Sequence, residues 1–181
     1  MKVVILGYTG LIGNSILENL STDKSLYLTC VGRSVKKKPF VSSRIKYLSW
    51  NFSSFKRSNL VFLENANIII NCVGKTDNSE NNLEYINVKF LKKLLYQINI
   101  KKSKVRIIHL SSVAVYGGGK NYLGRHKRIS ENSKIITDNL YSDTKYKGDL
   151  FIQNVVRKKI NKNFSYTILR ISNVFGVKKK S

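Results

Sequence analysis

The chain alternates between short apolar runs and longer segments in which apolar residues recur every three or four positions. The short runs are almost continuously apolar, which is typical of strands buried on both faces of a parallel sheet. The longer segments have the spacing of amphipathic helices, whose apolar side packs against such a sheet. The pattern therefore predicts an α/β fold, a doubly wound parallel sheet with helices on both faces. The predicted strands are residues 2–6, 26–31, 45–49, 67–73, 104–110 and 164–170.

Two long helical segments carry the clearest apolar stripes, at 79–100 and 141–160. Asp77 or Ser79 can cap the first segment, and Glu80 stands three positions after Asp77, as in a capping box. We interpret both stripes as core packing against the sheet. The stripe residues are Leu83, Ile86, Phe90, Leu91, Leu94, Leu95 and Ile98 in the first segment and Phe151, Ile152, Val155, Val156 and Ile160 in the second.

Three glycines, Gly7, Gly10 and Gly13, lie between the first predicted strand and a helical pattern that opens with Leu11 and Ile12. A dinucleotide diphosphate needs this order of strand, glycine turn and helix. The first glycine lets the chain turn off the strand, the second lets the backbone approach the phosphates, and the third lets the helix pack closely. The helix N-terminus adds unpaired N–H groups and partial positive charge. The spacing differs from the usual Gly-x-Gly-x-x-Gly, but its position predicts a dinucleotide site.

A Tyr-x-x-x-Lys pattern, which places a phenol and an ammonium on one face of a helix, begins at Tyr85, at Tyr116 and at Tyr141. The first lies inside a predicted core helix, and the second encloses three glycines that would not hold a helical turn. The third opens the helix after the fifth strand, so Tyr141 and Lys145 can reach the crevice at the carboxyl ends of the strands. Ser111-Ser112 leaves the fifth strand at that same edge. A hydroxyl, a phenol and an ammonium are therefore expected to converge there.

These motifs resemble those of the extended short-chain dehydrogenase/reductase superfamily, within it the NAD-dependent epimerase/dehydratase family that modifies nucleotide sugars. The resemblance covers essentially the whole chain. Its five motifs, in order, are Gly7-x-x-Gly10-x-x-Gly13, Asn71-Cys-Val-Gly74, Ser111-Ser112-Val-Ala-Val-Tyr116-Gly117, Tyr141-Ser-Asp-Thr-Lys145 and Leu169-Arg170-Ile-Ser-Asn173-Val-Phe-Gly176.

The resemblance implies a role for each matching residue. Tyr141 acts as general acid or base toward a sugar hydroxyl while hydride passes between the sugar carbon and the nicotinamide. Lys145 lowers the pKa of the phenol and holds the nicotinamide ribose. Ser112, four positions before the tyrosine of Val-Tyr-Gly, hydrogen-bonds the reacting oxygen. Asn173 matches a substrate-contacting position, and Ile171 a position that lines the nicotinamide pocket.

The segment after the second predicted strand bears on the choice of dinucleotide. An acidic residue there would bind the ribose 2′-hydroxyl of NAD, but this chain has Arg33 and Ser34 followed by lysines. A guanidinium and a hydroxyl suit a 2′-phosphate, so NADP is favoured over NAD. Asn51 stands where many relatives place an aspartate near the adenine. The other candidate cofactor contacts are Thr9, Leu11, Ile12, Cys72, Val73 and Gly74.

A length of 181 residues suits one domain with a substantial core. We expect residues 1–181 to form an NAD(P)-binding Rossmann domain, truncated before the substrate-binding lobe that follows the Arg-x-x-Asn motif in relatives. Such a chain would show little turnover by itself, and its sixth strand would lie near an exposed edge. Val113-Ala114 after Ser112 argue against a dehydratase, which usually has acidic residues there, so an epimerase or reductase is favoured.

The formal net charge of +23 raises the question of nucleic-acid binding. Most of the basic residues are lysines, in runs that are expected at loops and element ends, and they accompany abundant asparagine and isoleucine. This pattern is typical of a composition bias, and we find no RNA-binding motif with paired aromatics. A dinucleotide-binding protein without turnover is the second hypothesis, and an RNA-associated relative of the fold is the third.

The remaining expectations concern single residues and the setting of the chain. Cys30 and Cys72 are interpreted as buried free thiols of a reducing compartment, and without a secretory signal or membrane segment the chain is expected to be cytoplasmic. Arg170 is expected to be a structural ion partner and His109 a buried core residue, while His126 lies in a loop. Segments 79–100 and 141–160 are those through which relatives dimerise, so a homodimer is a further expectation.

Overall fold

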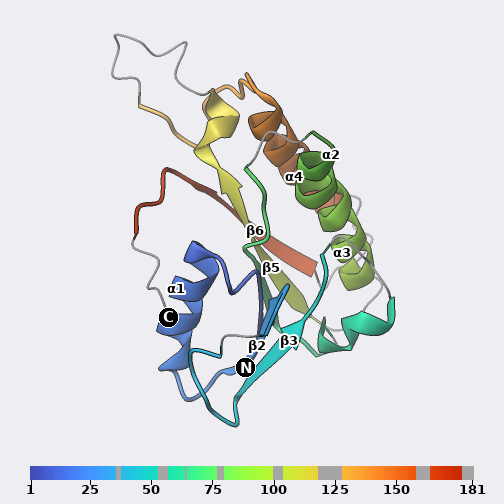
Figure 1. Ribbon diagram of the computed structural model, residues 1–181. Coiled ribbons are helices and arrows are strands. Elements are labelled where there is room, and N and C mark those ends of the chain that lie inside the picture. The colour runs from blue at the N-terminus through green and yellow to red at the C-terminus, as the bar shows by residue number, and fades with distance from the viewer. Residues whose placement is uncertain are drawn as a thin grey trace.

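Six parallel strands form one sheet in the computed structural model (Figure 1), in the order β3-β2-β1-β4-β5-β6. The structure describes residues 1–35, 38–52, 57–63, 65–76, 80–99, 104–117, 128–157 and 164–176. The predicted doubly wound α/β fold is confirmed, and every predicted strand is present to within a few residues. The strands are β1 Lys2–Leu6, β2 Tyr27–Gly32, β3 Ile45–Ser49, β4 Ile68–Asn71, β5 Val105–Ser112 and β6 Phe164–Ile171.

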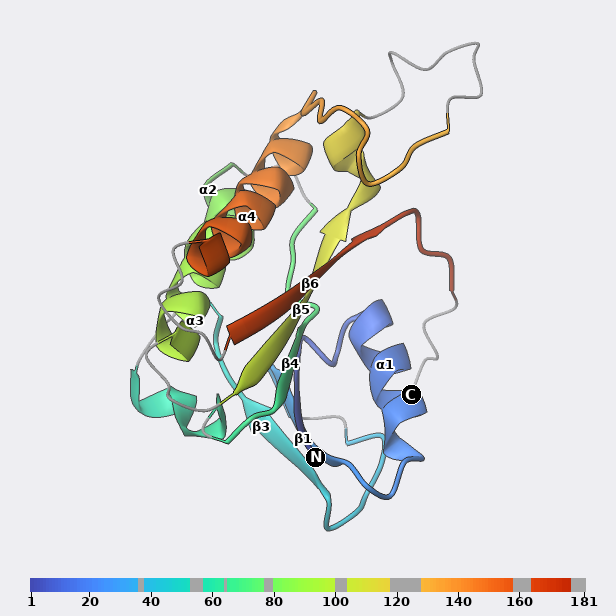
Figure 2. The ribbon, with the colours of Figure 1, turned by 180° about the vertical axis from the view of Figure 1, so that it is seen from behind.

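Helices lie on both faces of the sheet, but unequally. Helix α1, Leu11–Ser21, lies on one face, and the helices between β4 and β6 lie on the other (Figures 1 and 2). On that second face, α2 (Glu80–Glu84), the π-helical turn η2 (Tyr85–Lys89) and α3 (Phe90–Asn99) follow one another without a break, and α4 (Leu140–Arg157) packs beside them. Two 3-10 turns, η1 (Arg57–Leu63) and η3 (Val113–Tyr116), complete the described elements.

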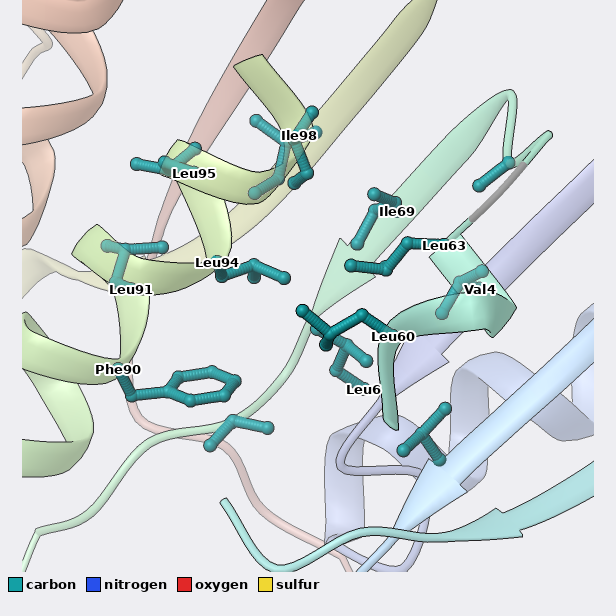
Figure 3. Packing of buried hydrophobic residues seen from close by; sticks show 14 of the residues in the cluster. Val4, Leu6, Leu60, Leu63, Ile69, Phe90, Leu91, Leu94, Leu95 and Ile98 are labelled. Atoms are coloured by element: carbon teal, nitrogen blue, oxygen red, sulfur yellow. The ribbon is translucent and has the colours of Figure 1, made fainter. Parts of the chain in front are cut away.

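The larger core lies between the sheet and α3. Val4 and Leu6 of β1 and Ile69 of β4 lie on the side of the sheet that faces α3, and Leu94 and Phe90 of that helix segment point toward them (Figure 3). Leu60 and Leu63 of η1 fill the space between. A smaller core under α1 gathers Ile5, Leu17 and other residues of β1, β2 and β4. The predicted stripe of 79–100 is therefore core packing, as expected. Its buried members are Leu83, Phe90, Leu91, Leu94, Leu95 and Ile98.

Element ends differ from the predictions where hydrogen bonds extend or interrupt a pattern. Strand β5 continues to Ser112 because Ser111 and Ser112 stay in register with Arg170 and Ile171 of β6. The predicted helix 79–100 contains the π-helical turn, which its apolar spacing does not indicate. Its candidate caps Asp77 and Ser79 lie outside the described residues, as do the end of the predicted helix 141–160 and His126.

Candidate active site

Gly7 turns the chain off β1 in a conformation that requires glycine. Its φ of +81° is in the left-handed region, and its N–H donates to the Val31 carbonyl at 2.8 Å. A Cβ there would also lie 3.2 Å from the backbone of Cys72 and Val73. The turn is therefore wedged between β2 and the end of β4, and this fixes where α1 begins.

Packing requires a glycine at position 13 but not at position 10. A Cβ at Gly13 would clash with the Gly7 carbonyl oxygen and lie 2.9 Å from Tyr8 Cα, so the close packing of α1 on the turn excludes a side chain. Gly10 has an ordinary φ of −76° and caps α1 without a side chain. A Cβ there would contact only the Gly7 carbonyl oxygen, at 3.4 Å. Packing does not require a glycine at this position, which leaves exposed space at the helix N-terminus for a phosphate group.

The end of β2 presents Arg33 and Ser34 to solvent at the same edge of the sheet. Their backbone is held in place, because the Arg33 carbonyl accepts from Ser49 Oγ at 3.0 Å and the Ser34 carbonyl from the Tyr8 hydroxyl at 3.3 Å. Asn51 follows β3 and is also exposed. The side chains that bear on the choice of dinucleotide therefore follow neighbouring strands.

The chain leaves β4 through a turn stabilised by Asn71. This buried side chain accepts from the Val73 N–H at 3.1 Å, and its Nδ2 lies 3.1 Å from His109 Nδ1. His109 is 2% exposed, and burial holds its pKa well below the ordinary value, so it is the buried histidine that was expected. Cys72 is free but partly exposed, a correction to the expectation of two buried thiols. Burial raises the pKa of its thiol to about 12.

The two serines at the end of β5 differ in exposure. Ser111 is 2% exposed, whereas Ser112 is partly exposed and accepts from the Ala114 N–H at 3.2 Å, which caps η3. Ser112 is therefore the hydroxyl that a ligand can reach.

Lys145 projects from α4 to the end of β5. Its buried Nζ donates to the Leu110 carbonyl at 2.6 Å, and a Cβ at Gly74 would lie 3.7 Å from it. Burial lowers the pKa of Lys145 to about 8, against the opposing effects of Asp149 and Cys72. Tyr141 lies one turn earlier on the same helix face and is partly exposed.

The start of α4 is fixed by a reciprocal cap. The Asn139 side chain accepts from the Ser142 N–H at 2.8 Å, and Ser142 Oγ donates to the Asn139 carbonyl at 2.8 Å. Asparagine is among the best N-cap residues because its oxygen satisfies an unpaired helix N–H. This cap sets the position of Tyr141, two residues further on.

Asn87, in the π-helical turn, is a site residue that the sequence reasoning missed. It is 4% exposed, its amide bonds both the N–H and the carbonyl of Lys75 at 3.1 Å, and it donates to Thr144 Oγ1 at 3.1 Å. It thereby ties the segment after β4 to α4 beside Lys145. The available signal was a polar residue between Ile86 and Val88 in an apolar helix, since π turns are frequent at functional sites.

The structure thus brings the glycine turn, the segment Cys72–Gly74, the end of β5 and Lys145 to one edge of the sheet. Ile171 ends β6 and is partly exposed, and Asn173 beyond it is exposed. The chain then returns toward α1, where Gly176 lies against Leu11 (Figure 1). The described residues contain no group of His, Cys, Asp and Glu able to hold a metal ion, and none of the described helices is long and apolar enough to cross a membrane.

Comparison with solved structures shows the same fold in larger proteins. The UDP-glucuronic acid 4-epimerase of Bacillus cereus, in complex with NAD, matches 97% of this chain with a TM-score of 0.79 and 19% identity. The UDP-Glc/GlcNAc 4-epimerase of Campylobacter jejuni matches 93% of the chain with a TM-score of 0.74 and 17% identity. A short-chain dehydrogenase/reductase superfamily protein of Agrobacterium tumefaciens, with bound NAD, matches 94% of the chain with a TM-score of 0.76 and 14% identity.

The chain spans 58%, 52% and 48% of the lengths of these three proteins. No curated protein matches the sequence significantly. The model of the NAD dependent epimerase/dehydratase family matches residues 3–181, nearly the whole chain. With the glycine turn and the parallel sheet described above, this match shows that the chain belongs to the NAD-dependent epimerase/dehydratase family.

Proposed function

We propose that the chain is the dinucleotide-binding part of a nucleotide-sugar epimerase or reductase, with Ser112, Tyr141 and Lys145 at its reactive centre. The observation that carries the proposal is the buried Lys145, whose Nζ bonds the end of β5 two residues before Ser112. Two further observations support the proposal: the open space at Gly10, and the UDP-sugar epimerases among the proteins that share the fold.

When bound, the nicotinamide of the dinucleotide accepts or donates hydride at a sugar carbon. Tyr141 removes the proton of the sugar hydroxyl, or returns it in the reductive direction. Lys145 favours the phenolate because its positive charge lies on the same helix face. Ser112 donates to the reacting oxygen, and the Gly10 backbone with the α1 N-terminus binds the diphosphate.

The preferred dinucleotide is proposed to be NADP, although the B. cereus and A. tumefaciens structures contain NAD. The support is the pair Arg33 and Ser34, exposed at the end of β2 in place of an acidic residue. A guanidinium there suits the charge of a 2′-phosphate.

The proposal is tested by mixing the oxidised dinucleotide, the protein and a UDP-sugar, and following the fluorescence of reduced nicotinamide over one turnover. Although little turnover is expected from this chain by itself, a single turnover by wild type should form measurable bound reduced cofactor. Tyr141→Phe should form at least about a hundredfold less, the usual size of general base catalysis. Tyr146→Phe, on the same helix, is the matched control and should resemble wild type. Equal signals from Tyr141→Phe and wild type would remove the assignment.

A further inference from the structure

A partly buried ion pair on β6 and α4 connects, through Tyr116, the two elements that carry the proposed reactive residues. Asp149 is fully buried on α4, and its Oδ2 accepts from Arg170 Nε at 3.0 Å. Arg170 Nη1 donates to the Tyr116 hydroxyl at 2.6 Å, with the guanidinium 5.1 Å from the centre of the Tyr116 ring. Arg170 is thus the structural ion partner expected from the sequence, but its partners lie at the reactive edge.

The three residues linked by these contacts belong to three different elements. Asp149 lies one turn beyond Lys145 on α4, Arg170 lies opposite Ser111 in the pairing of β5 with β6, and Tyr116 ends the η3 turn that Ser112 begins. A shift of α4 relative to η3 would have to break one of two partly buried, charge-assisted hydrogen bonds. The contacts therefore fix the helix that carries Tyr141 and Lys145 against the turn that carries Ser112.

The charge of the Lys145 ammonium interacts with titratable groups from several elements. Cys72 follows β4, His109 lies on β5, and Asp149 lies on the same helix. Burial raises the pKa of the Cys72 thiol to about 12 and keeps His109 neutral, so neither is charged near neutral pH. Arg170 is a cation and faces Asp149. Burial raises the pKa of the Asp149 carboxyl, while the hydrogen bond and the charge of Arg170 oppose that rise and favour the carboxylate. Asp149 is therefore the anion that opposes the loss of charge from buried Lys145.

We propose that Asp149 is a positioning residue that acts on the reaction through Lys145 and Arg170. Its carboxylate supplies the counter-charge for the buried ammonium and, through Arg170 and Tyr116, holds α4 in place against the Ser112 turn. The inference rests on the proposed function for its catalytic meaning, but its electrostatic part is tested without adding a dinucleotide.

Because Lys145 has different pKa values in the folded and unfolded chain, its contribution to stability changes with pH. The pKa of Lys145 falls from the ordinary 10.5 to about 8 on folding, so between these values the unfolded chain binds more protons. The stability of wild type relative to Lys145→Met is therefore constant below about pH 8 and rises above it. Removing the Asp149 charge lowers the folded pKa further, so the rise should begin at lower pH, by about one pH unit or more.

The test is urea unfolding from neutral to alkaline pH of wild type, Asp149→Asn, Lys145→Met and the double variant, without cofactor. We expect the rise to begin at lower pH in Asp149→Asn, and Asp149→Glu to restore the wild-type onset. Arg170→Met is the matched control: it breaks the same ion pair but leaves the carboxylate, so its onset should not move lower. An unchanged onset in Asp149→Asn, or an equal fall in Arg170→Met, would overturn the proposal.

If Asp149→Asn does not fold, the double variant decides, because removing the ammonium removes the need for its counter-charge. Folding of the double variant supports the proposal, and failure of both variants contradicts it. A shifted onset together with no dinucleotide binding by wild type would instead overturn the proposed function and leave the electrostatic role of Asp149 standing.

Discussion

The three glycines of the first turn are glycines for different physical reasons. Gly7 needs a positive φ, and Gly13 needs the absence of a Cβ against the Gly7 carbonyl. Gly10 needs neither, since its backbone is ordinary and its Cβ would find room. Within this short motif, Gly7 and Gly13 are therefore required by the fold, whereas Gly10 is free to serve ligand binding.

This difference predicts opposite outcomes for a matched pair of variants. Gly13→Ala forces a methyl group against backbone that cannot rotate away, so it should lower the free energy of unfolding by about 1–3 kcal/mol or more. Gly10→Ala changes only a helix cap and should cost about 1 kcal/mol or less. Urea unfolding measures both. Equal losses of stability would show that Gly10 is also held by packing.

Arg33 predicts a selective effect on one dinucleotide. Its exposed guanidinium would gain a charge-assisted bond with the 2′-phosphate of NADPH and none with NADH. Arg33→Ala should therefore weaken NADPH binding about tenfold or more, with NADH binding unchanged. Fluorescence titration measures both constants, and Lys46→Ala, an exposed cation on β3, is the control. Wild-type binding of equal strength for the two dinucleotides would contradict the preference.

At the scale of elements, the helical segment from α2 to α3 shows what periodicity reveals and what it misses. Its leucines recur every three or four residues, so the face buried against the sheet could be predicted. The π turn could not be predicted, and the bonds that its Asn87 makes are to Lys75 and Thr144, 12 and 57 residues away. Contacts between residues so far apart in sequence leave no local pattern. Arg170 was expected to be an ion partner, but its pairing with Asp149 left no local pattern either.

Asn87→Ala should lower the free energy of unfolding by about 1–3 kcal/mol, because the partly buried backbone groups of Lys75 and the Thr144 hydroxyl each lose one hydrogen bond. Lys89→Ala, exposed in the same turn, should change it by less than about 0.5 kcal/mol. Thermal or urea unfolding compares the two. A cost at Asn87 no larger than at Lys89 would mean that the amide does not hold the π turn in place.

At the scale of the molecule, the alternation of apolar runs and helical stripes was enough to predict the fold, because parallel strands buried on both faces can be covered only by intervening helices. Ser112 could be selected over Ser111 by resemblance, and the structure leaves Ser112 as the more exposed of the two. That Ser112, Tyr141 and Lys145 act together remains a prediction. The chain also exposes apolar side chains on α3, α4 and β6.

These exposed side chains predict how copies of the chain associate. We propose a homodimer through the outer faces of α3 and α4, where Tyr96 is 65% and Leu150 is 37% exposed. Tyr96→Glu should then convert a dimer to a monomer in sedimentation, and Leu169→Lys on β6, at the edge of the described sheet, should not. Dissociation by Leu169→Lys alone would place the contact at the β6 edge instead.

The N-terminus of α1 is proposed to receive a dinucleotide diphosphate in the space left open at Gly10. The most direct measurement is a fluorescence titration of folded wild type and folded Gly10→Val with NADPH and NADH. We predict saturable binding by wild type and affinity at least about tenfold weaker in Gly10→Val, the size of one lost charge-assisted contact. Absence of binding by wild type, or equal binding by the variant, would contradict the account.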